Sequence, residues 1–331
     1  MRENGSRKRK IVKIATAVLL MVFIVVSALV LLQNWEKTQG MFPTLSPEDT
    51  TVEHNGKEYV LNQDVDTLLV LGLDKYMGVH TGASYNNDKQ ADFLMLLVFN
   101  NKEKTTTAIH INRDTMARVN VLAIDGIKVI NTVTKQIALS HSYGNGKEIS
   151  CRNTADSVSE LLYGMQIDHF ISLTMDSVGI YNDLVGGVEV TVLDDFKGID
   201  DTLIKGEKVL LKSKHALNYV RTRYGLDDSS NNNRMNRQQQ YVNALFEKSK
   251  KITEKNDEFI IDASLKMADY IVSDRSVTQL QELAKKIDDY KFMGIKTIKG
   301  ESKIGEEFIE FYPDNDDIKN LVIELFYTPA R

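Results

Sequence analysis

Two runs of almost unbroken apolar residues are the feature that most constrains how this chain can fold. Thr67–Leu73 reads TLLVLGL, and Phe93–Phe99 reads FLMLLVF. A strand with one solvated face alternates polar and apolar residues, whereas a strand buried on both faces is apolar throughout. Both runs therefore predict central strands of a sheet that other elements cover on both sides.

Strand and helix patterns alternate along the rest of the chain. Further strands are expected at 106–111, 167–173, 188–192, 291–298 and 307–312. Helices are expected at 132–142, 154–163, 177–184, 213–222, 234–250, 256–271, 276–287 and 315–327. This alternation predicts an α/β fold: a single layered α-β-α domain with a mixed central sheet flanked by helices. No linker is evident after residue 66, so we expect one domain over residues 65–331.

A basic tail and a long apolar run precede this domain. Ile14–Leu32 is 19 residues long and contains only Thr16 and Ser27 as polar residues, which is long enough for a helix to span a bilayer. The basic flank favours a cytoplasmic N-terminus. We expect a cytoplasmic tail at 1–13, a transmembrane signal anchor at 14–32 and an extracytoplasmic stalk at 33–64, with a hairpin near Asn55 and Gly56. The protein would then be a single-pass protein of the cell membrane.

A cleaved signal peptide is the alternative to this anchor. A cleavage site should follow a shorter apolar core, whereas the small residues Val26-Ser27-Ala28 lie inside the run. A buried core helix is disfavoured by the length of the run and by its basic flank.

Charge and cysteine content exclude several classes of protein. The formal net charge is -5, and residues 1–13 alone carry six basic residues and one acidic residue, so the remainder is strongly acidic. An acidic body does not suit a nucleic-acid partner. The single cysteine, Cys151, forbids an internal disulfide and is expected to be a small buried residue. His110, His141, His169 and His215 show no metal-ligand spacing and are expected in the core or on the surface.

Arginine is concentrated in two short windows. Beyond the tail the chain has nine arginines and 26 lysines, yet four of the nine lie in the lysine-free segment 221–237. The guanidinium group binds phosphate oxygens through two parallel hydrogen bonds and keeps its charge, so a phosphate site is predicted. Ion pairs with Asp114, Asp227 and Asp228 are the alternative. The arginines concerned are Arg221, Arg223, Arg234 and Arg237 in this segment, and Arg113 and Arg118 in the other window.

Two aspartates border the two apolar runs. Asp74 directly follows the first run and Asp92 directly precedes the second, so antiparallel pairing of the strands would bring both carboxylates to one sheet edge. Two carboxylates beside phosphate oxygens suit Mg²⁺, but the pattern alone favours the alternative that each is a strand-end cap or turn residue. Arg113 and Asp114 follow the third predicted strand, where open α/β sheets bind ligands.

Seven motifs follow one another in a specific order between roughly residues 65 and 245. They are VLGLD, ADFLML, INRDT, IKVIN, IDHFISLTMDSVGIYNDLVGGVEVTV, ALNYVRTRY and RMNRQQQ. With the N-terminal anchor, this series resembles the LytR–CpsA–Psr family of cell-wall glycopolymer transferases. The resemblance implies transfer of a glycopolymer, such as teichoic acid or capsule, from a polyprenyl-pyrophosphate carrier to peptidoglycan. The product would be a phosphodiester, the reaction would need Mg²⁺, and the helices of the middle segment would supply an apolar groove for the polyprenyl chain.

The resemblance also assigns roles to residues of this chain. Asp74 and Asp92 match the aspartates associated with Mg²⁺. We assign catalysis to Arg113, Arg221, Arg223 and Asp228. Pyrophosphate binding is assigned to Arg113, Arg118, Arg221, Arg223, Arg234, Arg237 and Gln238.

Three positions depart from the family pattern. Tyr76 and Gln90 stand where the family usually has arginines, and Asn231 stands where it usually has an aspartate that Asp227 or Asp228 could replace. These departures keep two alternatives open: a regulator that binds lipid-linked glycans without transferring them, and a pyrophosphatase that uses water as the acceptor.

Overall fold

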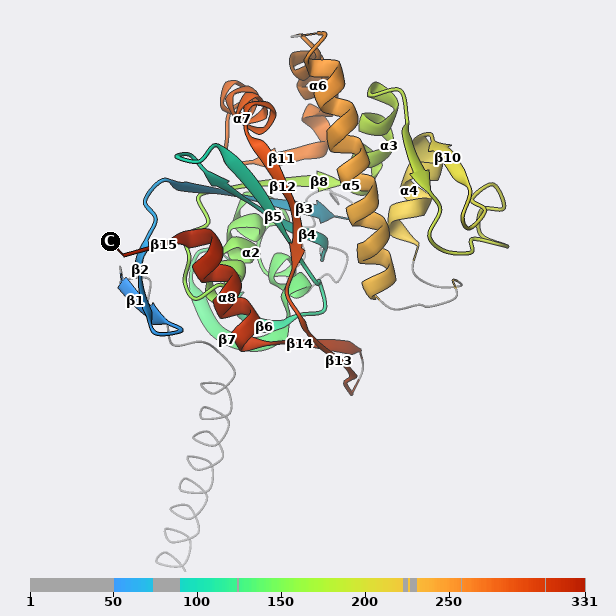
Figure 1. Ribbon diagram of the computed structural model, residues 1–331. Helices are drawn as coiled ribbons and strands as arrows, with labels where there is room; N and C mark the ends of the chain where they lie inside the picture. The colour runs from blue at the N-terminus through green and yellow to red at the C-terminus, as the bar shows by residue number, and fades with distance from the viewer. Residues whose placement is uncertain are drawn as a thin grey trace, which may run out of the picture. The chain divides into compact units, whose positions relative to one another are not determined.

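A six-stranded mixed sheet forms the centre of the protein in a computed structural model (Figure 1). The structure describes residues 51–73, 90–123, 125–222, 226, 231–256, 258–306 and 308–330. The strand order is β11-β8-β3-β4-β5-β12. β4 runs antiparallel to β3 and β5, whereas β8 is parallel to β3 and β12 is parallel to β5. The predicted α/β fold with a mixed central sheet is therefore confirmed. The strands are β3 (Val65–Leu73), β4 (Ala91–Asn100), β5 (Thr105–Ile111), β8 (His169–Thr174), β11 (Ile271–Ser273) and β12 (Lys291–Thr297).

Helices cover both faces of this sheet, as the apolar runs predicted. Leu69 and Leu71 of β3, with Leu94 and Leu96 of β4, pack in one core with α2 (Glu148–Leu161) and α8 (Asn315–Phe326), which lie below the sheet in Figure 1. The opposite face carries Phe99, whose ring lies 5.0 Å from the Lys286 amine of α7 (Val277–Asp289). α5 (Asn231–Thr253) also contacts this second face.

A second hydrophobic core joins the middle helices to a small two-stranded sheet. The sheet consists of β9 (Val188–Thr191) and β10 (Lys208–Leu211), and its core partners are α3 (Met175–Leu184), α4 (Ser213–Arg221), α5 and α6 (Phe259–Met267). Gly187 opens β9 with φ +88°, and a Cβ there would lie 2.7 Å from the Leu211 carbonyl oxygen. The Gly-Gly pair before β9 is thus required by a turn that brings two backbones into close approach.

The folded domain begins before residue 65, where the sequence placed the end of a stalk. β1 (Thr51–His54) and β2 (Lys57–Leu61) form a hairpin, and β2 pairs with β15 (Tyr327–Pro329) near the C-terminus. The hairpin turn is the predicted Asn55-Gly56, with φ of 52° and 73°. Positive φ at both central residues suits a type I′ turn, which explains the Asn-Gly pair.

The helix predicted at 132–142 is wrong. β6 (Met116–Leu122) and β7 (Val129–Gln136) form an antiparallel hairpin, and only a 3₁₀ helix, η2 (Ile137–Ser142), follows. The segment VINTVTKQ is rich in β-branched residues, which lose rotamer freedom in a helix and pack well across a strand pair. The helix predicted at 256–271 is likewise shorter, because α6 ends at Met267 and is followed by η3 (Ala268–Tyr270) and β11.

A further hairpin precedes α8. β13 (Gly300–Ile304) pairs with β14 (Ile309–Pro313). Within the described ranges, no helix combines the length and the apolar character that crossing a membrane requires. The predicted span at 14–32 falls outside those ranges.

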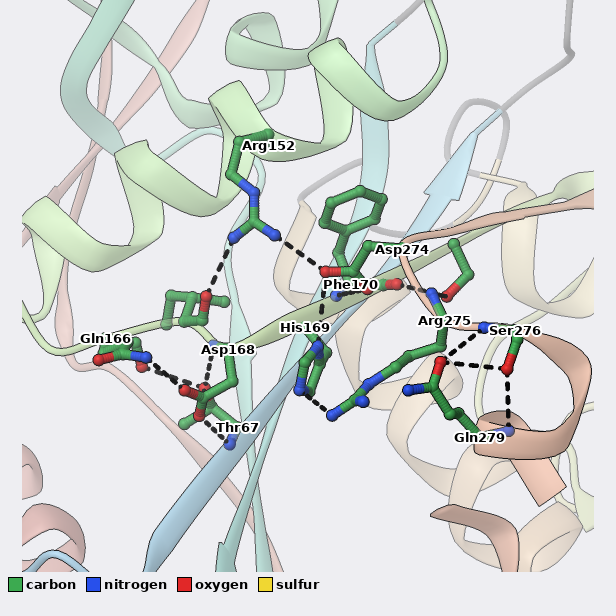
Figure 2. A network of polar contacts seen from close by, with 12 residues as sticks. Thr67, Arg152, Gln166, Asp168, His169, Phe170, Asp274, Arg275, Ser276 and Gln279 are labelled. Atoms are coloured by element: carbon green, nitrogen blue, oxygen red, sulfur yellow. Dashed lines mark hydrogen bonds and ion pairs between the residues drawn. The ribbon is translucent and has the colours of Figure 1, made fainter. Parts of the chain in front are cut away.

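Polar side chains gather at the end of the sheet where β8 begins (Figure 2). Arg152 of α2 donates to Asp274 at 2.9 Å and to the Ile167 carbonyl at 3.1 Å. His169 lies between Asp274, at 3.5 Å, and Arg275, with which it shares a hydrogen bond. We call Arg152, His169, Asp274 and Arg275 the far-edge network.

Candidate active site

The ends of several strands converge at the opposite edge of the sheet. Leu73, the last residue of β3, pairs with Ala91 at the start of β4 and with Thr174 at the end of β8. The predicted antiparallel pairing of the two apolar strands is therefore confirmed, and it places Asp92 at this edge. Asp74 follows Leu73 directly but lies outside the described residues, so a carboxylate pair stays a prediction.

Arg113 is held at this edge by the start of β4. Its two terminal nitrogens donate to Oδ1 of Asp92 and to Oε1 of Gln90, and its Nε lies 3.5 Å from Oδ1 of Asp114. The Arg113 side chain is 14% exposed and that of Asp92 is 22% exposed, so the pair is accessible at one side only. The sequence marked Gln90 as a departure from the family, but no pattern indicated that it binds Arg113.

An amide bridge connects the end of β5 to the start of α5. Asn231, the first residue of α5, donates to Oδ1 of Asn112 and accepts a hydrogen bond from Arg234. All three side chains are buried, with exposures of 5%, 5% and 6%. Arg113 follows Asn112 in the chain, so the bridge places the Arg234 helix beside the Arg113 turn. The roles of Asn112 and Asn231 were missed in the sequence, because neutral amides carry no charge signal.

The histidine of the same strand end stays neutral. His110 is 1% exposed, stacks against Phe93 with ring centroids 4.9 Å apart, and contacts Gln239 of α5 at 3.3 Å. Burial and the nearby Arg234 charge lower the pKa of His110 to about 3. His110 therefore adds no positive charge to the site at neutral pH and packs as a core residue.

Arg237 and Gln238 hold the helix that carries Arg221. α4 ends at Arg221, and the last carbonyls of a helix lack partners within it. Gln238 donates to the Val220 carbonyl at 3.1 Å, and Arg237 donates to the Tyr219 carbonyl at 2.8 Å. These contacts from α5 cap α4 and fix the segment in which Arg221 lies.

The structure gives Arg237 a packing role in place of the predicted contact with a phosphate. The residue is 1% exposed and donates to the Asp194 carboxylate and to the Thr222 carbonyl as well as to Tyr219. Its guanidinium also lies 5.5 Å from the Phe196 ring centroid. All three donor nitrogens are engaged inside the protein, so no described feature of its placement supports ligand binding.

Arg118 lies on β6, where it pairs with Glu160 of α2 at 2.7 Å, and its side chain is 40% exposed. This placement makes it a half-exposed link between β6 and α2, and no described contact joins it to Arg113. Arg223 and Asp228 fall outside the described residues, so their catalytic assignments stay predictions.

Among the described residues, no group of three or more His, Cys, Asp or Glu side chains could hold a metal ion. Cys151 is fully buried with Sγ 3.6 Å from Nε2 of His141, and burial raises its thiol pKa to about 12. A thiol with so high a pKa is inert at neutral pH, which agrees with its expected role as a small core residue.

Residues 31–325 match the model of the LytR_cpsA_psr family, and the chain belongs to this family. It is similar to the polyisoprenyl-teichoic acid–peptidoglycan teichoic acid transferase TagU of Bacillus licheniformis, with 26% identity over 255 residues that cover 76% of this chain and 75% of that one. It is 28% identical to the transferase TagT of Bacillus subtilis, again over 76% of this chain and 75% of the relative. The structure of TagT bound to LI-WTA has a similar fold, with a TM-score of 0.60, 22% identity, and coverage of 86% of this chain and 97% of that one.

Proposed function

We propose that this protein transfers a glycopolymer from a polyprenyl-pyrophosphate carrier to peptidoglycan, outside the cytoplasm and anchored by residues 14–32. The similarity to relatives named as teichoic acid transferases extends over three quarters of each relative's length, which supports the reaction class. The polymer itself could be teichoic acid, capsule or a related wall polysaccharide, since the identity to TagU is 26%.

The observation that carries the proposal is the link between the Arg113 turn and α5: hydrogen bonds through Asn112 and Asn231 hold Arg234 beside this turn, and Gln238 of the same helix caps the helix that ends at Arg221. Arg113 follows β5, Arg221 ends the helix that α5 caps, and Arg234 lies on the first turns of α5 itself. Phosphoryl transfer requires mainly positioning and neutralisation of charge on phosphate oxygens. Guanidinium groups fixed by hydrogen bonds supply both without reorganising during the reaction.

The proposed reaction forms one phosphorus–oxygen bond and breaks another. A hydroxyl of muramic acid attacks the phosphorus on the sugar side of the pyrophosphate, and the bond between that phosphorus and the bridging oxygen breaks. The bridging oxygen leaves with polyprenyl phosphate, and the hydroxyl proton passes to a base or to solvent. Arg113 and Arg234 would stabilise the negative charge that builds on the oxygens of the attacked and leaving phosphates.

The described residues are compatible with Mg²⁺ at this edge. Asp92 is partly exposed and oriented by Arg113, and the register places the backbone that leads to Asp74 next to it. Two carboxylates and water are a usual ligand set for Mg²⁺. A bound Mg²⁺ would supply further neutralisation of phosphate charge.

The proposal is tested with Arg221→Ala in cells that lack redundant family members. We expect attachment of glycopolymer to peptidoglycan to fall by about 100-fold or more, the effect of removing one preorganised donor to a transition-state charge. Arg152→Ala is the matched control, because Arg152 belongs to the far-edge network. Undiminished attachment in the Arg221 variant would refute the assignment.

Neutral residues at positions 90 and 231 favour one second candidate, a protein that binds lipid-linked glycans without transferring them. Purified protein incubated with lipid-linked glycan, Mg²⁺ and peptidoglycan separates the candidates. Retained ligand without product at every Mg²⁺ concentration would support the binding protein. Release of polyprenyl phosphate in the absence of peptidoglycan would instead indicate hydrolysis.

A further inference from the structure

We propose that Asn231 is a positioning residue that joins Arg234 to the Arg113 turn through an uncharged amide, and that this chain needs an amide there. The inference rests on the proposed function, because it concerns how the same site holds its guanidinium groups for a pyrophosphate. Hydrogen bonds link Asn112, Asn231 and Arg234, and all three residues are buried.

The orientation of each amide is fixed by a group that can only donate. The backbone N–H of Asp114 donates to Oδ1 of Asn112 at 3.0 Å, so the oxygen of Asn112 is the atom that also faces Asn231. The guanidinium of Arg234 has no acceptor, so the atom of Asn231 that faces it must be oxygen. The remaining Nδ2 of Asn231 therefore points at the Asn112 oxygen as a donor.

An aspartate at position 231 cannot make both contacts. It could accept from Arg234, but its other oxygen would face the Asn112 oxygen, and two buried acceptors would then meet without a proton between them. It would also place a negative charge against Arg234, whereas the amide oxygen leaves the charge of the guanidinium intact. Arg113 and Asp114 are the charged neighbours on the turn, and His110 is neutral there.

If Asn231 only stabilised the start of α5, the expected effects of the two substitutions would be reversed. Aspartate caps a helix about as well as asparagine, and a negative charge at a helix N-terminus is favourable. If Asn231 served only α5, Asn231→Asp would be neutral and Asn231→Ala would be the more damaging change. Which of the two substitutions is the more damaging therefore decides between the two roles of Asn231.

The experiment measures binding of farnesyl pyrophosphate, a soluble polyprenyl pyrophosphate, to the full chain by calorimetry at constant pH and salt. We expect Asn231→Asp to raise Kd by about tenfold or more and Asn231→Ala by about threefold, since the first adds repulsion and charge and the second removes only the link. Asn232→Asp is the matched control, because Asn232 is the exposed neighbour on the same helical turn and should bind as the unmodified protein does. Urea unfolding midpoints of all variants are measured in parallel, which separates a loss of binding from a loss of stability.

The inference is overturned if Asn231→Ala binds more weakly than Asn231→Asp, or if both bind as the unmodified protein does. If Asn231→Asp lowers the unfolding midpoint, Asn231→Ser decides: an uncharged hydroxyl that binds nearly as well as asparagine supports the inference, and a loss equal to that of alanine overturns it. Failure of the unmodified protein to bind the probe would instead refute the proposed function, and this inference with it.

Discussion

Arginines gather at both ends of the central sheet, and the two groups differ in burial and in partners. At the far edge, the Arg152 side chain is 44% exposed and pairs with Asp274 (Figure 2). At the other end, the Arg113 side chain is 14% exposed, and Arg234 is buried. We call the second group, with Asp92 and Asn231, the strand-end site.

The difference shows that the number of arginines does not locate a phosphate site. A half-exposed guanidinium paired with a carboxylate is screened by water and salt, so its field on a ligand is weak. In the strand-end site, Arg113 and Arg234 each donate to a neutral amide oxygen, from Gln90 and Asn231 respectively. Arg113 also pairs with the carboxylates of Asp92 and Asp114, but the amides orient both guanidinium groups without adding negative charge, which suits the binding of anions.

Arg237 is a third case, in which a guanidinium is buried and neutralised by a carboxylate. We expect Arg237→Ala to lower the free energy of unfolding by about 3–5 kcal/mol, because it leaves the Asp194 charge buried without its partner. Arg152→Ala should cost only about 0–1 kcal/mol, the range of exposed pairs. Urea denaturation measures both, and the double variant Arg237→Ala with Asp194→Ala should recover part of the loss. Equal costs for the two single variants would show that burial does not separate these arginines.

The sequence predicted the central sheet well because buried strands have a strong local signature. The runs that became β3 and β4 lie at the middle of the sheet, and their pairing brought Asp92 to the predicted edge. The helix at 132–142 failed because its apolar residues fit either period, and pairing with β6 decided in favour of a strand. The β-branched residues of VINTVTKQ favoured a strand locally, but the partner strand β6 is a tertiary feature that the local pattern of apolar residues does not show.

The candidate site was predicted only in part, for a related reason. Charge concentration selected Arg113 and Arg234, which the structure places near each other, but it also selected Arg237, whose partner Asp194 lies 43 positions away in the chain. Spacing alone does not show whether a guanidinium faces a carboxylate or a ligand. The neutral partners Gln90, Asn112 and Asn231 gave no charge signal, and their roles depend on contacts between distant segments.

A further negative charge beside Arg113, which Asp92 and Asp114 already contact, should make the strand-end site resemble the far edge. Gln90→Glu keeps an acceptor for Arg113 but adds a negative charge. We therefore expect farnesyl pyrophosphate to bind about tenfold more weakly, which corresponds to ~1.4 kcal/mol. This loss is well within the ~4 kcal/mol of interaction energy between two unit charges ~4 Å apart near a protein surface. Gln279→Glu is the matched control, because Gln279 is the third residue of a capping box with Ser276 that glutamate also satisfies. Calorimetry compares the two variants. Equal binding by both would show that the neutrality of Gln90 is irrelevant.

The smallest effect on stability is expected at the start of β3, where Asp66 pairs with Lys286 of α7. Burial raises the pKa of Asp66, but hydrogen bonds from Lys286 and Asn101 together with the Lys286 charge outweigh it, and the net pKa lies below its ordinary value of 3.8. A lowered pKa in the folded state stabilises the protein above the unfolded pKa, and this contribution is lost as the pH falls through the folded value. Asp66→Asn should therefore cost about 0–1 kcal/mol at pH 7, because the Asp66 side chain is 52% exposed, and nothing measurable once the pH is below both values. Urea unfolding at pH 7 and near pH 2, repeated in high salt, measures the difference; a cost that persists at the acidic pH would mean that Asp66 acts through packing rather than charge.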